Sequence, residues 1–255
     1  MLQAHSLLWN YLWVAPNVLL LLLGFFIWKR GLGRQYPTFL AFAILSSLGD
    51  LLVYTADVAP FVSATSFWRI GWGGVLLESL LKFVVIGEVF SRTLNPYPSI
   101  AQLGRRLISG FGAALVLVAT LLAGFSKGDS TVRLISGMHL LEQTVFLIEL
   151  GLILFLFLFA AYFRLTMDRF SFGILLGFGI STCEYLATWA IITNGDPSTV
   201  GRTLLDFLNM ATYHLCVLIW GYYLFVPGRV PARAAVALPE NNLALWNREL
   251  ERLLQ

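Results

Sequence analysis

Six ionisable side chains fall inside apolar stretches of the sequence that are long enough to cross a bilayer. They are Asp50, Glu78, Lys82, Glu149, Glu184 and His214. A charged group at the bilayer centre costs at least about 2.5–3.5 kcal/mol, so a residue of this kind marks a candidate functional site. Apart from Lys82, each lies 14 to 16 residues from the cytoplasmic basic residue that ends its stretch. At about 1.5 Å per helical residue, this spacing predicts a shared depth of about 21–24 Å and therefore one polar layer inside a helical bundle.

The polar layer contains one ammonium group, and its spacing to a carboxylate favours pairing. Lys82 follows Glu78 by four residues, the favourable order for an ion pair on one helix face. We expect all six side chains to face one another, with at least two carboxyl groups within hydrogen-bonding reach of Lys82 or His214. Two interpretations fit this layer. It is a site for a small molecule, lipid, ion or proton, or it is an interhelical network that fixes packing, with contributions from Ser47, Ser181, Thr182 and Asn209.

Three further polar residues lie towards the opposite ends of their stretches. His139 and Glu142 are three residues apart and so share a helix face, and Asp206 belongs to the last apolar stretch. They are candidates for an outer vestibule that leads to the polar layer. An exposed edge of the bundle is an equally good interpretation.

The sequence lacks the residue sets of the common membrane enzymes and photoreceptors. Its three histidines are too few for a histidine-clustered hydrolase, and the last apolar stretch has no lysine for a retinal Schiff base. It has no phosphate-binding glycine loop, nucleophile elbow or kinase motif. Cys183 and Cys216 both lie in apolar segments, which favours small buried side chains rather than a disulfide or metal pair. We therefore expect no catalytic residue and no metal site, and the sequence names no cofactor.

The elements that must position these residues follow from composition. The 255 residues are 58% hydrophobic and 12% charged, against about 25% charged in a soluble domain. A span needs roughly 17–25 apolar residues, and inside lipid it must be helical. Seven stretches qualify: 12–28, 38–54, 70–91, 107–125, 134–163, 170–193 and 203–226. They predict an all-α membrane protein whose residues 1–227 form a seven-transmembrane-helix bundle.

Basic residues predict the orientation of the spans. Twelve of the 17 lysines and arginines fall in one set of alternating loops and the tail. The positive-inside rule then places the N-terminus outside and the C-terminus in the cytoplasm, as a multi-pass protein of the cytoplasmic membrane. The dispersed charge favours contact with the lipid bilayer and not with nucleic acid.

Residues 228–255 are expected to form a cytoplasmic linker and a short amphipathic C-terminal helix. Between residues 239 and 254, Leu243, Trp246, Leu250 and Leu253 share one face. This helix would lie on the inner membrane surface or dock a protein partner.

Two patterns concern packing. Gly173, Gly177 and Gly179 form a small-residue face on the sixth stretch, which predicts a close helix contact. The first and fourth stretches carry no charged residue and are expected to be the most lipid-exposed or purely structural.

Several phrases resemble a family of bacterial seven-span integral membrane proteins of uncharacterised activity. They are Leu-Phe-Leu-Phe-Leu-Phe at 154–159, the glycine-rich run 172–179, Cys216-Val-Leu-Ile-Trp220 and Leu245-Trp-Asn-Arg-Glu-Leu250. The resemblance implies the seven-helix bundle and carries no activity, cofactor or site residue.

Function is expected to be binding rather than catalysis. The first interpretation is a non-enzymatic receptor, sensor or accessory subunit that binds a small molecule, lipid or ion at the polar layer. The second is a proton- or ion-coupled small-molecule transporter, and the third is an intramembrane enzyme that modifies lipid.

Overall fold

The structure is a computed structural model that describes most of the chain. It describes residues 6–59, 62–94, 131–162, 167–195 and 199–226, and the single positions 102, 106, 109, 110, 113, 114, 117, 165, 248, 251 and 252. The expected span 107–125 and the tail 228–255 therefore lie largely outside the described residues.

The described residues form six long α-helices, so the expected all-α class is confirmed. They are α1 (Leu7–Lys29), α2 (Pro37–Val58), α3 (Ala64–Thr93), α5 (Thr131–Tyr162), α6 (Arg169–Gly195) and α7 (Thr199–Phe225). All except α3 contain a segment long and apolar enough to cross a membrane. The chain is thus a multi-span helical membrane protein. Five charged residues interrupt the apolar sequence of α3, whose segment is not one of these five candidate spans.

Helices α1 and α3 begin five to six residues earlier than the apolar runs predict, and polar side chains cap both starts. Ser6 accepts a hydrogen bond from the Trp9 amide at 3.3 Å, and Ser63 accepts one from the Ser66 amide at 3.2 Å. A capping hydroxyl satisfies an amide at the helix start that has no partner in the helix. Between α1 and α2, Gly31 takes the left-handed conformation, with φ of 71°, at the start of the 3-10 turn Leu32–Arg34.

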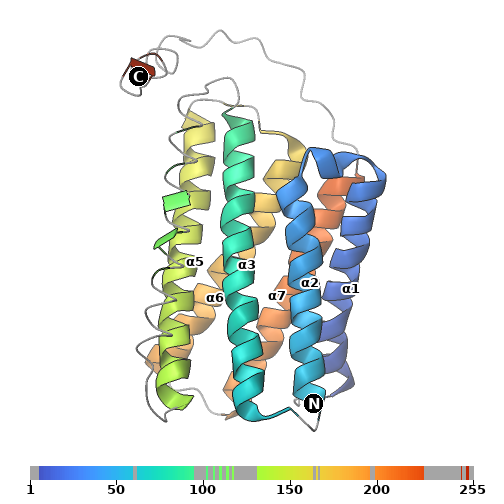
Figure 1. Ribbon diagram of the computed structural model, residues 1–255, viewed down its shortest axis with the longest axis vertical. Coiled ribbons are helices and arrows are strands. Elements are labelled where there is room, and N and C mark those ends of the chain that lie inside the picture. Colours follow the sequence, from blue (N-terminus) through green and yellow to red (C-terminus); the bar gives the residue numbers. More distant parts are fainter. Residues whose placement is uncertain are drawn as a thin grey trace.

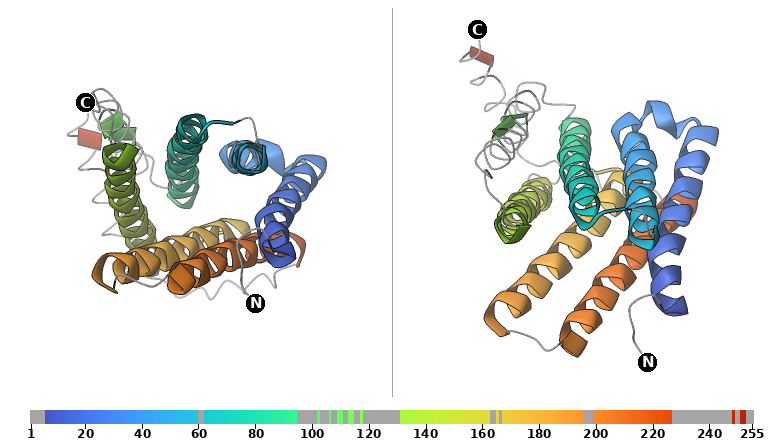
Figure 2. Two further views of the ribbon diagram at one scale, coloured as in Figure 1. Left: turned by 90° about the horizontal axis from the view of Figure 1, so that it is seen from below. Right: turned by 60° about the horizontal axis from the view of Figure 1, so that its bottom comes forward.

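The six helices close into a ring. Each packs on the next in the order α1, α2, α3, α5, α6, α7, and α7 returns to α1, while α3 also touches α6. Viewed from one end, α6 and α7 lie along one side, with α2 and α3 opposite and inclined to them (Figure 2). The ring therefore has an interior that all six helices border.

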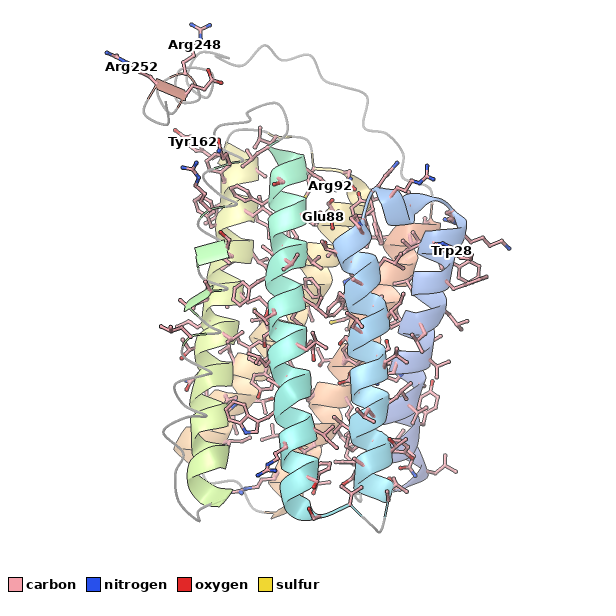
Figure 3. The ribbon with its side chains drawn as sticks, viewed as in Figure 1. Trp28, Glu88, Arg92, Tyr162, Arg248 and Arg252 are labelled. Carbon is pink, nitrogen blue, oxygen red and sulfur yellow. The ribbon has the colours of Figure 1, made fainter. Side chains whose placement is uncertain are left out.

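The direction of each helix defines two ends of the ring (Figure 1). α1, α3, α5 and α7 run one way, and α2 and α6 run the other. Trp28, Arg92 and Tyr162, near the ends of α1, α3 and α5, lie at the same end of the molecule (Figure 3). We call this the basic end, because Lys29, Arg92 and Arg169 lie in terminal turns there. The other is the N-terminal end.

The outer surface of the ring is apolar. Large side chains such as Leu22, Leu48, Leu158 and Leu218 are exposed. Soluble proteins rarely expose extended apolar surface, whereas a membrane protein presents it to lipid. These faces fit contact with a bilayer.

The contact between α6 and α7 depends on two glycines, as the small-residue pattern predicts. Trp220 and Tyr223 of α7 lie directly against Gly177 and Gly173 of α6. The Trp220 indole donates a hydrogen bond to the carbonyl of Ile174 at 3.3 Å, and the Cys216 thiol donates one to the carbonyl of Gly177 at 3.2 Å. Trp220 then joins the buried rings of Phe39, Phe42 and Phe178. These rings make a dense apolar core in the half of the ring towards the basic end.

We predict that Gly177→Ala destabilises the protein. A Cβ at position 177 would clash with Trp220 Nε1, so the indole must move out of its packed position. Overpacking of this kind costs about 1–3 kcal/mol of unfolding free energy. Gly151→Ala on α5 is the matched control, because a Cβ there meets nothing within 4 Å. Thermal melting in detergent should show a lower midpoint for Gly177→Ala alone. Equal midpoints would contradict the packing role.

Candidate functional site

Lys82 forms an ion pair inside the ring. Its ammonium lies 3.0 Å from a carboxylate oxygen of Glu78, one turn earlier on α3, as the spacing predicts. Only 6% of Lys82 is exposed. A buried ammonium is stable only with close carboxylate partners, because its desolvation must be offset.

Two more carboxyl groups interact with the same ammonium. Asp50 on α2 and Glu149 on α5 both interact electrostatically with Lys82. The Phe146 ring centroid lies 5.1 Å from the ammonium nitrogen, within cation–π range. Lys82 is thus the common partner of carboxyl groups from three helices. We call Asp50, Glu78, Lys82 and Glu149 the Lys82 cluster.

Glu149 is the most buried member of this cluster. It is 1% exposed, and neither of its carboxyl oxygens has a hydrogen-bond partner among the described residues. Its charged neighbours are Lys82 and Glu78, and the Thr182 hydroxyl of α6 lies close to it without an aligned hydrogen bond. A carboxyl group in this position depends on the Lys82 charge for compensation.

Asn17 links α1 and α7 to the cluster. Its amide donates to the carbonyl of Trp13 at 2.9 Å and accepts from the Tyr213 hydroxyl at 3.3 Å. It also interacts with the Asp50 carboxyl group. Asn17 is not among the residues that the sequence singled out, and the first stretch was expected to be lipid-exposed or structural. On this face of α1, Asn17 is 1% exposed and ties the helix to α7 and to the cluster. A lone asparagine in an otherwise apolar run was the available indication.

A cavity of about 620 Å³ opens beside the Lys82 cluster. Every one of the six described helices contributes to its wall, and the wall combines aromatic rings with polar groups. It is lined by Trp9, Leu12, Trp13, Asn17, Asp50, Phe67, Val75, Glu78, Ser79, Lys82, Phe146, Ser181, Tyr185, Asp206, Asn209, Met210 and Tyr213. Trp9 and Phe67 lie in the first turns of α1 and α3, whereas Lys82 lies about 22 Å further along α3. The cavity therefore extends inward from the N-terminal end.

Two residues of the expected polar layer lie elsewhere. Glu184 accepts a hydrogen bond from Thr188 of its own helix at 2.8 Å, and the His214 ring lies 5.8 Å from the ring of Tyr11. Neither residue lines the cavity. The reason is helical phase: their neighbours Tyr185 and Tyr213 face the cavity, and a step of one residue turns the side chain by about 100°. Lys82 has one described carboxylate within ion-pair distance, where we expected at least two.

The outer vestibule candidates have different outcomes. Asp206 is exposed and lines the cavity near the N-terminal end. His139 and Glu142 belong to α5, but their side chains lie outside what the structure describes.

A second polar cluster joins three helices at the basic end. Glu88 pairs with Arg92 at 3.4 Å and accepts hydrogen bonds from the amide and hydroxyl of Thr38. The guanidinium of Arg92 lies over the Tyr36 ring at 4.4 Å, and Tyr36 donates to Asp168 at 2.5 Å. Burial of the Tyr36 phenol and its bond to Asp168 raise its pKa above the usual value. Figure 3 shows Glu88 and Arg92 near this end.

A wider cavity of about 1060 Å³ lies beside that second cluster. Its polar lining includes Tyr36, Thr38, Glu88, Arg92 and Asp168, which already bind one another. These bonds hold the starts of α2 and α6 against the end of α3, which is a structural role. The Lys82 cavity is the better candidate site. Glu88 and Asp168 are both held by hydrogen bonds within their own cluster, whereas among the described residues Lys82 has Glu78 alone within ion-pair distance.

No protein-family model, curated protein or solved structure matches this chain. The resemblance to a seven-span family is thus supported only at the level of a multi-span helical membrane protein.

We predict that Lys82→Met destabilises the protein far more than Lys29→Met, which removes an exposed lysine at the end of α1. Loss of one partner of a buried ion pair costs about 3–5 kcal/mol, and here three carboxyl groups lose their common cation. Glu78→Gln should cost less, because Lys82 keeps Asp50 and Glu149 as partners. Thermal melts in one detergent would rank the three variants. Similar losses for Lys82→Met and Lys29→Met would show that the cluster does not stabilise the ring.

Proposed function

We propose that this chain is a non-enzymatic membrane receptor, sensor or accessory subunit that binds a small molecule in the Lys82 cavity. The observation that carries this proposal is a cavity bordered by six helices whose wall combines aromatic rings with an incompletely balanced set of charges. Its volume of about 620 Å³ falls within the roughly 300–1,000 Å³ of small-molecule sites. Polar groups at fixed positions in a mainly apolar wall give such a site orientation and specificity.

Binding explains the residue types better than catalysis does. The hydroxyls of Ser79 and Ser181 line the cavity, but none of its described lining residues is a histidine. A serine nucleophile needs an adjacent general base, and the Lys82 ammonium, which is ion-paired with Glu78, carries a proton and cannot accept one. A lipid-modifying enzyme is therefore the weakest of the three interpretations.

We also propose seven spans with the N-terminus outside. α3 ends at the basic end and α5 begins at the N-terminal end, so residues 95–130 connect opposite ends of the ring. The apolar stretch 107–125 supplies the length for that crossing. α3 counts as a span because it lies in the ring between α2 and α5 and runs beside them. We place the protein in the cytoplasmic membrane. The positive-inside rule then puts the basic end on the cytoplasmic side.

A reporter fusion tests this topology. An alkaline phosphatase domain, which folds only outside the cytoplasm, should be inactive after Gln255 and active when inserted after residue 128. A fluorescent protein that folds in the cytoplasm should give the reverse pattern. Phosphatase activity after Gln255 would contradict the proposed orientation.

The tail is proposed as a membrane-surface or partner-docking segment through residues 239–254. Arg248, Glu251 and Arg252 are exposed, as expected of the polar face of such a helix. The lipid bilayer is the partner common to both interpretations.

A co-purification experiment tests the binding proposal. Native mass spectrometry of the protein in mild detergent should show a bound molecule of a few hundred daltons. Val75→Trp should reduce its occupancy, because Val75 lines the cavity and the indole would fill it. Leu77→Trp is the control on the same helix, since Leu77 is exposed outside the cavity. Equal occupancy in both variants would place the bound molecule elsewhere and contradict the proposal.

The alternative is a proton- or ion-coupled transporter. It is favoured by one specific observation, the buried Glu149 carboxyl group without a hydrogen-bond partner beside Lys82. Buried carboxyl groups of this kind serve as proton carriers in transporters. Uptake into proteoliposomes that depends on a proton gradient would favour this alternative over a receptor.

A further inference from the structure

We infer that the cavity takes a small organic cation, an alkylammonium group attached to an apolar body. This inference rests on the proposed function and names the ligand class of the same site. It follows from the balance of charge along the wall and from the aromatic rings beside it.

The charge balance of the cavity wall is negative. Asp50, Glu78 and Asp206 line it, and Lys82 is the single lysine or arginine among its described lining residues. The Lys82 ammonium is paired with Glu78 at 3.0 Å and is shared with Glu149 and Asp50. One ammonium cannot balance three carboxyl groups, so Asp50, which also contacts Asn17, is only partly compensated. A carboxylate without enough positive charge beside it is costly in a low-dielectric site. A bound cation would supply that charge and would be attracted to the site.

The aromatic wall suits the same ligand. Trp9, Trp13, Tyr185 and Tyr213 all line the cavity, and the negative face of an aromatic ring attracts ammonium groups. Edge-to-face contacts hold the tryptophans in place, at 6.0 Å between the rings of Trp9 and Trp13 and 5.5 Å between those of Trp13 and Tyr54. The rings are thus fixed before a ligand arrives, which lowers the cost of binding.

Other ligand classes fit less well. A metal cation prefers a shell of about six or more oxygens, whereas much of this wall is aromatic and aliphatic. Asp50 and Asp206 would repel an anion. A neutral molecule would leave the Asp50 charge only partly compensated. An organic ammonium instead uses both the carboxylates and the rings. It can come from a free amine or from the ammonium headgroup of a lipid, two sources that the experiment must separate.

Isothermal titration of the full chain in maltoside detergent tests the ligand class. The probes are benzyltrimethylammonium, benzyl alcohol and phenylacetate, which share a ring and differ in charge. The cation should bind at least tenfold more tightly than either of the others. A fourth arm uses a short-chain phosphatidylethanolamine below its micelle concentration. Tighter binding of this lipid than of benzyltrimethylammonium would assign the ammonium to a lipid headgroup, and weaker binding would assign it to a free amine.

Variants place the cation in the cavity. Asp50→Asn should weaken benzyltrimethylammonium binding at least tenfold, whereas Asp57→Asn should not, because Asp57 is exposed on the same helix and does not line the cavity. If Asp50→Asn fails to fold, Asp206→Asn replaces it, since Asp206 is an exposed residue at the mouth. Its effect should be at least threefold. Trp13→Leu should also weaken binding, and Trp28→Leu at the basic end should not.

The outcomes separate this inference from the function on which it rests. Preferred binding of phenylacetate or benzyl alcohol would overturn the cation and keep a small-molecule site. Equal effects of Asp50→Asn and Asp57→Asn would also overturn it. No binding of any probe, together with no co-purified molecule, would contradict the proposed function itself.

Discussion

A single ammonium group buried among carboxyl groups is the constraint on which the rest of this ring depends. Lys82 would be costly in the interior without partners, and Asp50, Glu78 and Glu149 would be costly without Lys82. Their helices must therefore turn particular faces inward and stay at matched depths. α2, α3 and α5 satisfy this requirement on one side of the ring, and Asn17 and Tyr213 extend it to α1 and α7.

The two halves of the ring differ in packing. Towards the basic end, the rings of Phe39, Phe42, Phe178 and Trp220 interlock, and the glycine face of α6 lets α7 approach closely. Dense packing of this kind leaves few voids and restrains the relative positions of the helices. Towards the N-terminal end, the polar groups around Lys82 border a cavity instead. A rigid half that supports an open half is a suitable arrangement for a binding site whose wall comes from six helices.

The sequence predicted the helices well because the membrane permits few alternatives. Apolar length determined the helices to within a few residues at most ends, and the caps at Ser6 and Ser63 account for part of the extra turns. The common depth expected from the sequence includes Asp50, Glu78, Lys82 and Glu149, and these four groups interact in the structure. Depth alone leaves the rotation of each helix undetermined, and rotation turns Glu184 and His214 away from the cavity and brings Asp206 to its wall. Charge in an apolar run does not point to Asn17, because an uncharged amide links the helices there through two hydrogen bonds.

Polar side chains of the ring border a cavity reached from water, while neighbouring residues face lipid. Cysteine accessibility in lipid nanodiscs tests this arrangement, in a background with Cys183→Ser and Cys216→Ala. Asn209 lines the cavity, and Leu208 beside it on α7 is exposed on another face. With a membrane-impermeant quaternary-ammonium thiosulfonate, Asn209→Cys should react at least tenfold faster than Leu208→Cys. Equal rates, or faster reaction at position 208, would contradict a water-accessible cavity inside a lipid-facing ring.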